Sequence, residues 1–313
     1  MANRGYGWLS SVTKIAGDER FCIQRKGSAK LNTSRDLNNN GTIEPSEVLA
    51  VGEDDCVLFT TPVCVNTNVG ARALAIDAKG DVWVGCYADQ TVYQMDSRNG
   101  HIKGEAIQLG MPPYGAIVDS QQNLWLTNST SSGALQGVNT RTREVLNKDK
   151  NEKPVPITPD IGKCHSYGLA VDRADRVWVS GGCIYNHYAA TKKWSYCNLG
   201  GDFSGIVVDG DNNVYASKGN TLVQTHWDDA TAKCDNKLFR SVNLGDIGAK
   251  GVGLDIDGNV WTVGSKQAAR VNPKTGAVTG RTQRAQGHSR QGSPTLRGYQ
   301  LDWFCTPPAP PLN

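Results

Sequence analysis

The sequence has no apolar run near the roughly 18 residues that a membrane-spanning helix needs, so we expect none. It also has little net charge, since 33 basic and 30 acidic residues leave only +3. This balance gives no grounds for nucleic-acid binding. The densest basic stretch, residues 281–297, has no interleaved aromatic side chains. We therefore interpret it as a solvated loop, with a phosphate contact as the alternative.

Signatures of catalysis are scarce as well. The chain contains five histidines, no Gly-x-Ser-x-Gly elbow and no His/Cys cluster with zinc-ligand spacing. Only His165 lies in a loop that enters a predicted inner strand; the others fall on third strands or in outer loops. A single candidate base without a partner acid is weak ground for an enzyme. The sequence therefore favours a protein that is not an enzyme.

One phrase recurs along the chain: a Gly or Ala, a few apolar residues, an Asp, a polar turn, and an apolar pair that carries Trp or Tyr. The five complete copies place their Asp at Asp77, Asp119, Asp172, Asp209 and Asp257, and a half copy ends at Asp302. The matching aromatic residues are Trp83, Trp125, Trp178, Tyr215 and Trp261. Steps of 37 to 53 residues between these Asp residues are typical of propeller blades. A β-sandwich with coincidental turns is the alternative.

Each copy predicts two buried inner strands joined by a hairpin, followed by a third strand. Weaker fourth strands are predicted at residues 106–109, 155–157 and 242–244. Because a single four-stranded sheet cannot bury its apolar face alone, we expect the sheets to pack on one another around a central axis.

The two ends of the sequence indicate how this ring closes. Residues 298–303 supply only a first strand, whereas residues 1–4 and 11–15 resemble the end of a second strand and a third. We predict an all-β fold, a six-bladed β-propeller in one domain, closed by pairing of the N- and C-terminal segments. The predicted blades are 1–70 with 296–306, 71–112, 113–164, 165–202, 203–249 and 250–295, before a Pro-rich tail at 307–313.

Nine cysteines indicate an oxidising compartment, so we expect a secreted, periplasmic or cell-surface protein. No signal peptide precedes the repeats and the sequence starts inside a blade, so we expect an upstream leader or domain in the natural chain. Equivalent places in two blades predict the pairs Cys64–Cys86 and Cys164–Cys183. Adjacency of outer strands suggests Cys22–Cys56 and Cys197–Cys234, which leaves Cys305 unpaired. Buried, reduced cysteines are the alternative.

Residues 36–47 match the twelve-residue calcium loop of EF-hand proteins, inserted here in the first blade. The predicted oxygen ligands are Asp36, Asn38, Asn40, Thr42 through its carbonyl, and Glu47, with Gly41 at the tight turn. The flanking residues allow at most a short helical turn after the loop. We therefore predict a lone structural Ca²⁺ site, with an Asn/Gly-rich turn that binds no metal as the alternative.

Over residues 71–303 the repeats resemble the virginiamycin B lyase-like and NHL-type propellers, and the calcium loop is similar to that of secreted bacterial relatives. The lyases of this group place a His before the blade-initial Gly and an acid at the end of the second strand, with a magnesium ion that assists elimination. Here the residues before that Gly are Tyr114, Tyr167, Ser204 and Val252. No acid or His occupies the matching places.

What remains is a predicted binding surface at one mouth of the central channel, where loops enter first strands and leave second strands. Its residues are Arg72, Tyr87, Tyr114, Asn128, His165, Tyr167, Phe203, Lys218 and Arg297. Aromatic faces mixed with polar groups suit a glycan or a protein partner. Aromatic side chains that only plug the channel are the structural alternative. The alternative functions are a metal-assisted lyase or lactone-type hydrolase with His165 as the base, and a scaffold in a larger surface assembly.

Overall fold

The computed structural model describes residues 2–3, 10–24, 30–41, 43–50, 52–65, 70–129, 133–159, 164–197, 199–264 and 267–283. Within these residues the protein is all-β, apart from two 3₁₀ turns, η1 (Glu19–Phe21) and η2 (Pro45–Glu47). No helix in this part of the chain has the length and hydropathy needed to cross a bilayer. The predicted fold class, all-β, is confirmed.

The described strands form six antiparallel sheets. The first sheet contains β1 (Ala2–Asn3), β2 (Ser11–Ile15) and β3 (Val57–Pro62). The second contains β4 (Ala71–Ile76), β5 (Val82–Cys86), β6 (Thr91–Met95) and β7 (Ile102–Gln108). The third contains β8 (Gly115–Val118), β9 (Asn123–Thr127) and β10 (Leu135–Asn139).

Three four-stranded sheets follow along the chain. The fourth contains β11 (Ser166–Val171), β12 (Arg176–Gly181), β13 (Ile184–Tyr188) and β14 (Lys193–Cys197). The fifth contains β15 (Ile206–Val208), β16 (Asn213–Lys218), β17 (Thr221–Asp228) and β18 (Lys233–Asn243). The sixth contains β19 (Gly251–Leu254), β20 (Val260–Val263), β21 (Gln267–Val271) and β22 (Val278–Gln283).

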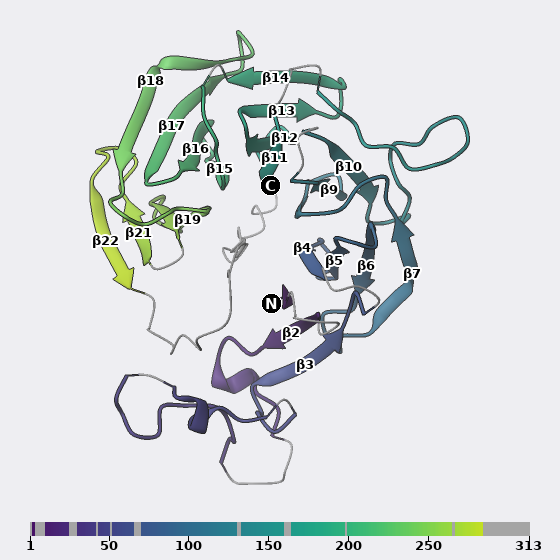
Figure 1. The fold of residues 1–313 in the computed structure, drawn as a ribbon, viewed down its shortest axis with the longest axis vertical. Coiled ribbons are helices and arrows are strands. Elements are labelled where there is room, and N and C mark those ends of the chain that lie inside the picture. The colour runs from purple at the N-terminus through teal and green to yellow at the C-terminus, as the bar shows by residue number, and fades with distance from the viewer. Residues whose placement is uncertain are drawn as a thin grey trace, which may run out of the picture.

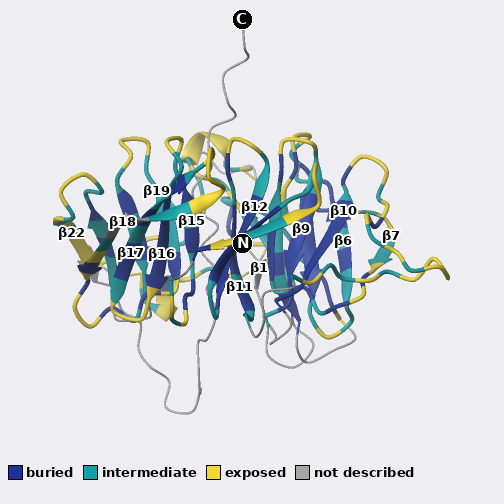
Figure 2. Cartoon of the chain, turned by 90° about the horizontal axis from the view of Figure 1, so that it is seen from above, coloured by how far each residue is buried: buried dark blue, intermediate teal, exposed yellow. Residues whose placement is uncertain are grey.

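The sheets are arranged like the blades of a propeller. The first strands contact one another in succession, β4 with β8, β8 with β11, β11 with β15 and β15 with β19. Figure 1 shows these strands toward the centre and β7, β14, β18 and β22 on the rim. In Figure 2 most of the buried residues lie in the strands, and many of the exposed residues lie in loops at the two faces. The predicted closing strand, residues 298–303, lies outside the described residues, so ring closure and the blade count stay predictions.

The apolar core lies between neighbouring sheets. Trp83 of β5 belongs to the same buried cluster as Leu126 of β9, and Trp178 of β12 shares a cluster with Trp227 of β17. The two rings of the latter pair meet edge to face, with centroids 5.3 Å apart. Each sheet therefore buries its apolar face on the next one, as the repeat pattern predicts.

The repeat Asp residues organise the hairpins between first and second strands. In each hairpin, one carboxylate oxygen accepts a hydrogen bond from the backbone N–H four residues later. The other oxygen accepts a hydrogen bond from the aromatic side chain six residues later. The aromatic donors lie 2.8–2.9 Å from their acceptors, in the pairs Trp83–Asp77, Trp125–Asp119, Trp178–Asp172, Tyr215–Asp209 and Trp261–Asp255. The residue three positions after each Asp adopts a positive φ, at Gly80, Gln122, Asp175, Asn212 and Gly258. The carboxylate thus fixes both the turn and the buried indole or phenol.

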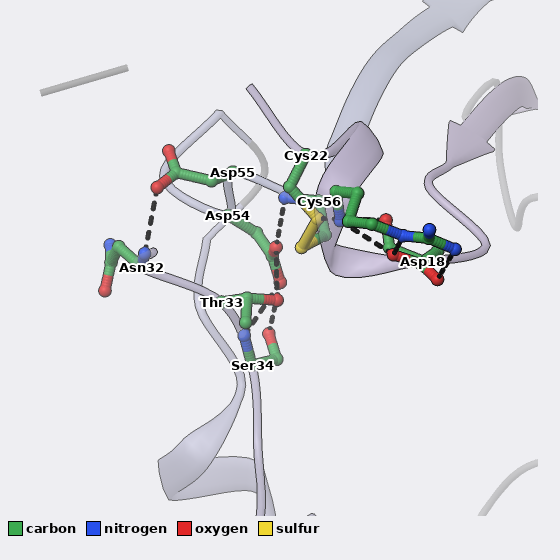
Figure 3. Close-up of a disulfide and its surroundings, with 9 residues drawn as sticks. Asp18, Cys22, Asn32, Thr33, Ser34, Asp54, Asp55 and Cys56 are labelled. Carbon is green, nitrogen blue, oxygen red and sulfur yellow. Dashed lines mark hydrogen bonds and ion pairs between the residues drawn. A yellow bond between two sulfur atoms is a disulfide. The ribbon is translucent and has the colours of Figure 1, made fainter. Parts of the chain in front are cut away.

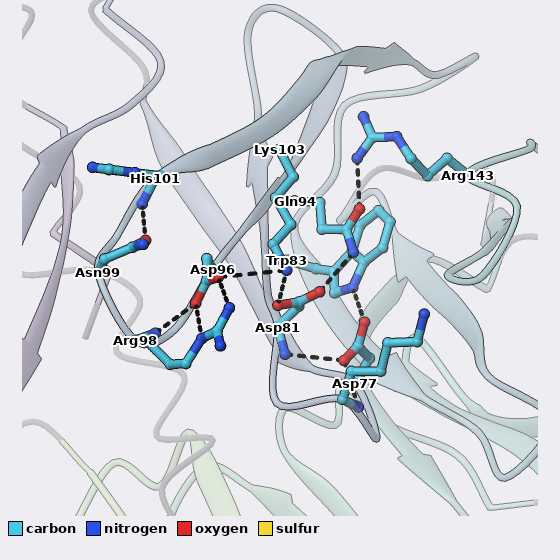
Figure 4. A network of polar contacts seen from close by, with 11 residues as sticks. Asp77, Asp81, Trp83, Gln94, Asp96, Arg98, Asn99, His101, Lys103 and Arg143 are labelled. Carbon is cyan, nitrogen blue, oxygen red and sulfur yellow. Dashed lines mark hydrogen bonds and ion pairs between the residues drawn. The ribbon is translucent and has the colours of Figure 1, made fainter.

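Figure 4 shows how the second sheet extends this arrangement outward. Buried Asp81 accepts hydrogen bonds from Gln94 at 2.9 Å and from Lys103 at 2.6 Å. Arg143 of the third sheet donates to the side-chain oxygen of Gln94 at 2.6 Å. A polar network therefore links the two sheets outside their apolar contact.

The fifth repeat was assigned to the wrong Asp by its sequence pattern. Trp261 donates to Asp255, not to Asp257, and strand pairing places Gly251 opposite Val263 and Gly253 opposite Trp261. The blade-initial glycine is therefore Gly251, and the residue before it is Lys250 rather than Val252. A shift of two residues keeps the same strand face inward, so alternation alone does not distinguish the two registers.

Two further sets of predictions concern the disulfides and the outer strands. All four predicted disulfides are confirmed: Cys22–Cys56, Cys64–Cys86, Cys164–Cys183 and Cys197–Cys234. Cys305 lies outside the described residues. The predicted fourth strand at residues 155–157 is wrong, because this segment makes only isolated bridges, Lys148 with Pro154 and Leu135 with Ile157. Pro154 and Pro156 have no backbone N–H to donate to a ladder.

Candidate functional site

Five equivalent positions surround one end of the inner strands, each directly before the blade-initial Gly or Ala. In three of them the backbone N–H donates to the carbonyl at the end of the second strand: Tyr114 to Thr127, Ser204 to Ser217 and Lys250 to Val263, at 2.6–2.8 Å. In the other two, Arg72 and Tyr167, the register shifts between the first and second strands. Such bulges re-aim a side chain and are common next to binding sites. We call Arg72, Tyr114, Tyr167, Ser204 and Lys250 the ring positions.

The glycines after the ring positions have a packing reason. A Cβ on Gly205 would lie 2.7 Å from the carbonyl oxygen of Lys250, and one on Gly168 would collide with the carbonyl oxygen of Ser204. The backbone of each next ring position therefore occupies the space that a side chain would need. This close contact brings neighbouring ring positions together.

Four of the five ring positions and Tyr87 form a continuous row of side chains, which we call the mouth cluster: Arg72, Tyr87, Tyr114, Tyr167 and Lys250. The Arg72 guanidinium carbon lies 5.2 Å from the Tyr87 ring centroid and 5.0 Å from that of Tyr114. The Tyr114 and Tyr167 centroids are 5.1 Å apart, and their hydroxyls form a hydrogen bond at 3.3 Å. Lys250 Nζ lies 5.8 Å from the Tyr167 centroid.

The protonation state of this row follows from its surroundings. Burial, followed by the hydrogen bond with Tyr114, raises the pKa of the Tyr167 hydroxyl well above its usual range. Tyr167 thus stays neutral near pH 7 and keeps its proton to donate. Arg72, Tyr87, Tyr114 and Tyr167 are partly exposed, and Lys250 is exposed. The cluster therefore offers aromatic faces, hydroxyl donors and two cations to a ligand.

The other predicted mouth residues lie in different surroundings. Phe203 is only 3% exposed and belongs to the core cluster of Trp178, although Lys218 Nζ lies 5.7 Å from its ring. Asn128 is buried and accepts a hydrogen bond from Ser166 at 2.8 Å. Partly buried His165 lies beside the Cys164–Cys183 disulfide, and its carbonyl accepts the N–H of Gly182. Arg297 lies outside the described residues.

Sequence reasoning missed Lys250 because of the register error in the fifth repeat. The signal was present, since every other repeat places its aromatic residue six positions after its Asp. Only Asp255 satisfies that spacing with respect to Trp261.

The calcium-loop segment forms a second candidate site, outside the ring of sheets (Figure 1). Asp36 accepts backbone hydrogen bonds from Asn40 at 3.2 Å and from Gly41 at 2.7 Å. Glu47, in η2, accepts from Leu37 at 2.8 Å and from Glu44 at 2.9 Å, so it joins the two ends of the loop. The short turn predicted after the loop is η2. Thr42 lies outside the described residues.

The donors of this loop suit a hard cation. Asp36, Asn38 and Glu47 provide carboxylate and amide oxygens, the ligand type that Ca²⁺ prefers. No group of three or more His, Cys, Asp or Glu side chains arranged to share a metal occurs in the described part of the chain. Calcium loops also use amide and backbone oxygens, so the loop residues fit Ca²⁺ and the metal stays a prediction.

A disulfide and the aspartate Asp54 hold the base of this segment (Figure 3). Cys22 and Cys56 are joined, and Asp54 accepts hydrogen bonds from the Ser34 N–H and hydroxyl and from the Thr33 hydroxyl at 2.7–2.9 Å. Burial alone would raise the pKa of Asp54, but these bonds and the one from the Cys56 N–H lower it to about 2. The two chain segments that lead to and from the loop are therefore fixed to each other.

No model of a known protein family matches the sequence, and no curated protein matches it either. Solved structures, however, share the fold. Virginiamycin B lyase from Staphylococcus aureus is 16% identical, with a TM-score of 0.55 over 70% of this chain and 71% of that one. A streptogramin B lyase is 16% identical, with a TM-score of 0.54 over 68% of each chain. Kuenenia stuttgartiensis hydrazine synthase is 11% identical, with a TM-score of 0.56 over 70% of this chain and 68% of that one. At these identities the comparisons show a related propeller fold alone.

Proposed function

We propose that the chain is a binding module that holds a glycan or a protein partner at the mouth cluster. The observation that carries this proposal is the row of partly exposed rings of Tyr87, Tyr114 and Tyr167, with Arg72 over the first two and Lys250 over the third. Ring faces provide apolar stacking area, while hydroxyl and cationic donors set the orientation of a polar ligand.

Of the two ligand classes, a glycan fits this row better. A protein partner needs a broad interface, typically about 800 Å² on each side, with an apolar core. The mouth cluster instead offers narrow ring faces beside donors. These match the apolar face of a sugar ring and its surrounding hydroxyl groups.

The test is a glycan array with the wild-type chain and the variants Tyr114→Ala and Tyr167→Ala. We expect binding to at least one glycan and a loss of about tenfold or more in each variant, equivalent to about 1.4 kcal/mol. Tyr196→Ala is the matched control, because Tyr196 is 56% exposed on the outer strand β14. Absence of binding to any glycan or protein would leave a scaffold role as the better description.

We also propose that Ca²⁺ stabilises the segment outside the ring and that the protein works in an oxidising compartment. Four disulfides are consistent with an extracellular location. The calcium site is supported by the loop geometry of Asp36 and Glu47. The predicted affinity suits extracellular calcium, because Asn at the third and fifth loop positions adds no charge.

The second candidate is a lyase or lactone-type hydrolase, which is supported by the fold shared with streptogramin B and virginiamycin B lyases. In this hypothesis His165 is the base. The substrate to test is quinupristin, because an inactive variant of the S. aureus enzyme has been crystallised with it. Ring opening detected by mass spectrometry and abolished by His165→Ala, but not by the control His101→Ala, would favour the enzyme. Intact quinupristin after incubation would eliminate that substrate.

A further inference from the structure

Among the five described ring positions, Arg72 alone carries a guanidinium. This group is charged at every working pH and carries five N–H donors. Its Nε is buried and has no hydrogen-bond acceptor, and Arg72 forms no ion pair with any carboxylate of the described residues. Its guanidinium lies over the rings of Tyr87 and Tyr114. A charged donor in a buried position is thus left without an acceptor.

Two other arginines of the chain have a carboxylate acceptor for their Nε. Arg98 Nε donates to Asp96 at 3.0 Å, and Arg176 Nε donates to Asp172 at 2.5 Å. Those side chains stabilise hairpins. The contrast indicates that Arg72 is not held by the fold in the same way, because buried charged donors are normally paired.

Lys250 is also without a carboxylate partner in the described part of the chain. Its Nζ donates to the Ser204 hydroxyl at 3.4 Å and lies over the Tyr167 ring. Arg72 lies over Tyr114 and Lys250 lies over Tyr167, so each ring of this tilted tyrosine pair has a cation beside it.

Among the described residues, no acid occupies the equivalent positions around the mouth. The ring positions carry Arg, Tyr, Tyr, Ser and Lys, and the neighbouring residues at the ends of the second strands are Gly85, Thr127, Ser180, Ser217 and Val263. Oxyanions are the natural complement of an unpaired guanidinium, which binds carboxylate or sulfate through two parallel hydrogen bonds.

We propose that the mouth cluster binds an acidic glycan, with the carboxylate or sulfate group on Arg72, a sugar ring over Tyr114 and Tyr167, and Lys250 as the second positive charge. This inference rests on the proposed binding function and names the chemical class of its ligand. A carboxylate or sulfate group complements the positive charge of the Arg72 guanidinium, whereas a neutral sugar brings no charge to it.

The test uses two pairs of probes that differ in charge. Tetragalacturonate and its methyl ester compare a carboxylate with its neutral form, and a dextran sulfate fragment and dextran compare a sulfate ester with its neutral form. Calorimetric titration of the whole chain should show that at least one acidic probe binds about tenfold or more tightly than its neutral partner. The probe that does so identifies the source of the oxyanion.

The variants separate the site from general attraction to a basic surface. Lys250→Gln removes an exposed charge without disturbing the core. It should weaken binding of the acidic probe severalfold and leave binding of the neutral probe unchanged. Arg72→Gln should cost about tenfold, once circular dichroism shows that it folds. Arg141→Gln, an exposed arginine in the turn after β10, is the matched control and should bind like wild type.

Three outcomes would overturn the proposal. Equal binding of acidic and neutral probes, unaffected by Lys250→Gln, would refute the acidic ligand but leave a glycan-binding function in place. Binding of polyglutamate without binding of any saccharide would assign the site to acidic protein segments. Absence of binding by every probe, and by the glycan array, would remove the proposed function together with this inference.

Discussion

The indole nitrogen of Trp261 donates to the carboxylate of Asp255 at 2.9 Å, two residues before the exposed Asp257. The same carboxylate accepts the N–H of Asn259 at 2.8 Å. One side chain therefore holds both the turn and the tryptophan of the sixth sheet. Asp257 contributes to the turn only through its backbone N–H, which donates to Asp255 at 3.1 Å.

This difference predicts a matched pair of variants. Asp255→Ala leaves the Trp261 indole and a turn N–H without an acceptor and should lower the free energy of unfolding by about 1–3 kcal/mol. Asp257→Ala should change it by less than about 0.5 kcal/mol, as expected for a surface position. Denaturant unfolding followed by tryptophan fluorescence measures both. A larger loss in Asp257→Ala would reverse the register assignment.

Acid should loosen the base of the calcium-loop segment. Hydrogen bonds lower the folded-state pKa of Asp54 to about 2 from an ordinary value of 3.8, despite its burial. Its stabilising contribution is therefore complete above about pH 4 and is lost as the pH falls through 2. Limited proteolysis between pH 5 and pH 2 should detect the opening.

Asp54→Asn should make this segment sensitive to protease already at pH 5. Asp18→Asn is the control, because the exposed pair of Asp18 with Arg20 contributes little. Equal protease resistance of Asp54→Asn and the wild type at pH 5 would show that Asp54 does not hold the base.

Calcium should raise the melting temperature. A ligand at about 100 times its Kd stabilises a folded protein by about 2.7 kcal/mol, enough for a shift of several degrees. Removal of the metal with EDTA should reverse the shift, and Asp36→Ala should abolish it. The exposed Asp211 lies outside the loop, so Asp211→Asn should respond to calcium like wild type. A melting temperature unaffected by calcium, EDTA and Asp36→Ala would disprove the metal assignment.

A buried histidine predicts a second pH effect. His187 on β13 is 5% exposed, lies between the rings of Trp125 and Trp194, and has a buried Nδ1 without a partner in the described part of the chain. Burial lowers its pKa to about 4 from 6.5, against the opposing hydrogen bond with the Lys193 backbone. Because the unfolded chain takes up this proton more readily, stability should fall as the pH drops from about 6.5 through 4.

Thermal melts of wild type and His187→Phe test this effect. The difference in melting temperature between pH 7 and pH 4 should be smaller in the variant, which has no proton to take up at this site. His101→Phe, at an exposed position, should keep the wild-type dependence. An identical pH dependence in all three proteins would rule out His187 as its source.

Much of the fold was predictable because local chemistry repeats. Turn residues next to alternating apolar residues predict the hairpins, and equivalent placement in two sheets predicts the pairs Cys64–Cys86 and Cys164–Cys183. Alternation did not fix the register of the sixth sheet, because Asp255 and Asp257 are two residues apart and so have the same place in the alternating pattern. Only the hydrogen-bonding partner, Trp261, distinguishes them.

The candidate site was less predictable, because which loop residues face one another depends on contacts between sheets. Arg72, Tyr87, Tyr114 and Tyr167 do come together. Phe203 also precedes a first strand, but its N–H donates to the Gly181 carbonyl at 2.6 Å and its ring packs in the core. The aromatic character of a residue does not indicate whether its ring lies at the mouth or packs in the core.

Some of the hydrogen bonds between sheets lie near the axis. The Thr127 hydroxyl donates to the Tyr167 carbonyl at 3.3 Å, and the Ser180 hydroxyl donates to that of Ser204. The rim of the third sheet, by contrast, has only isolated bridges where its neighbours have a fourth strand. A display peptide grafted between the exposed Lys150 and Asn151 would thus extend from a tolerant outer edge. The inner strands could remain a rigid carrier for it.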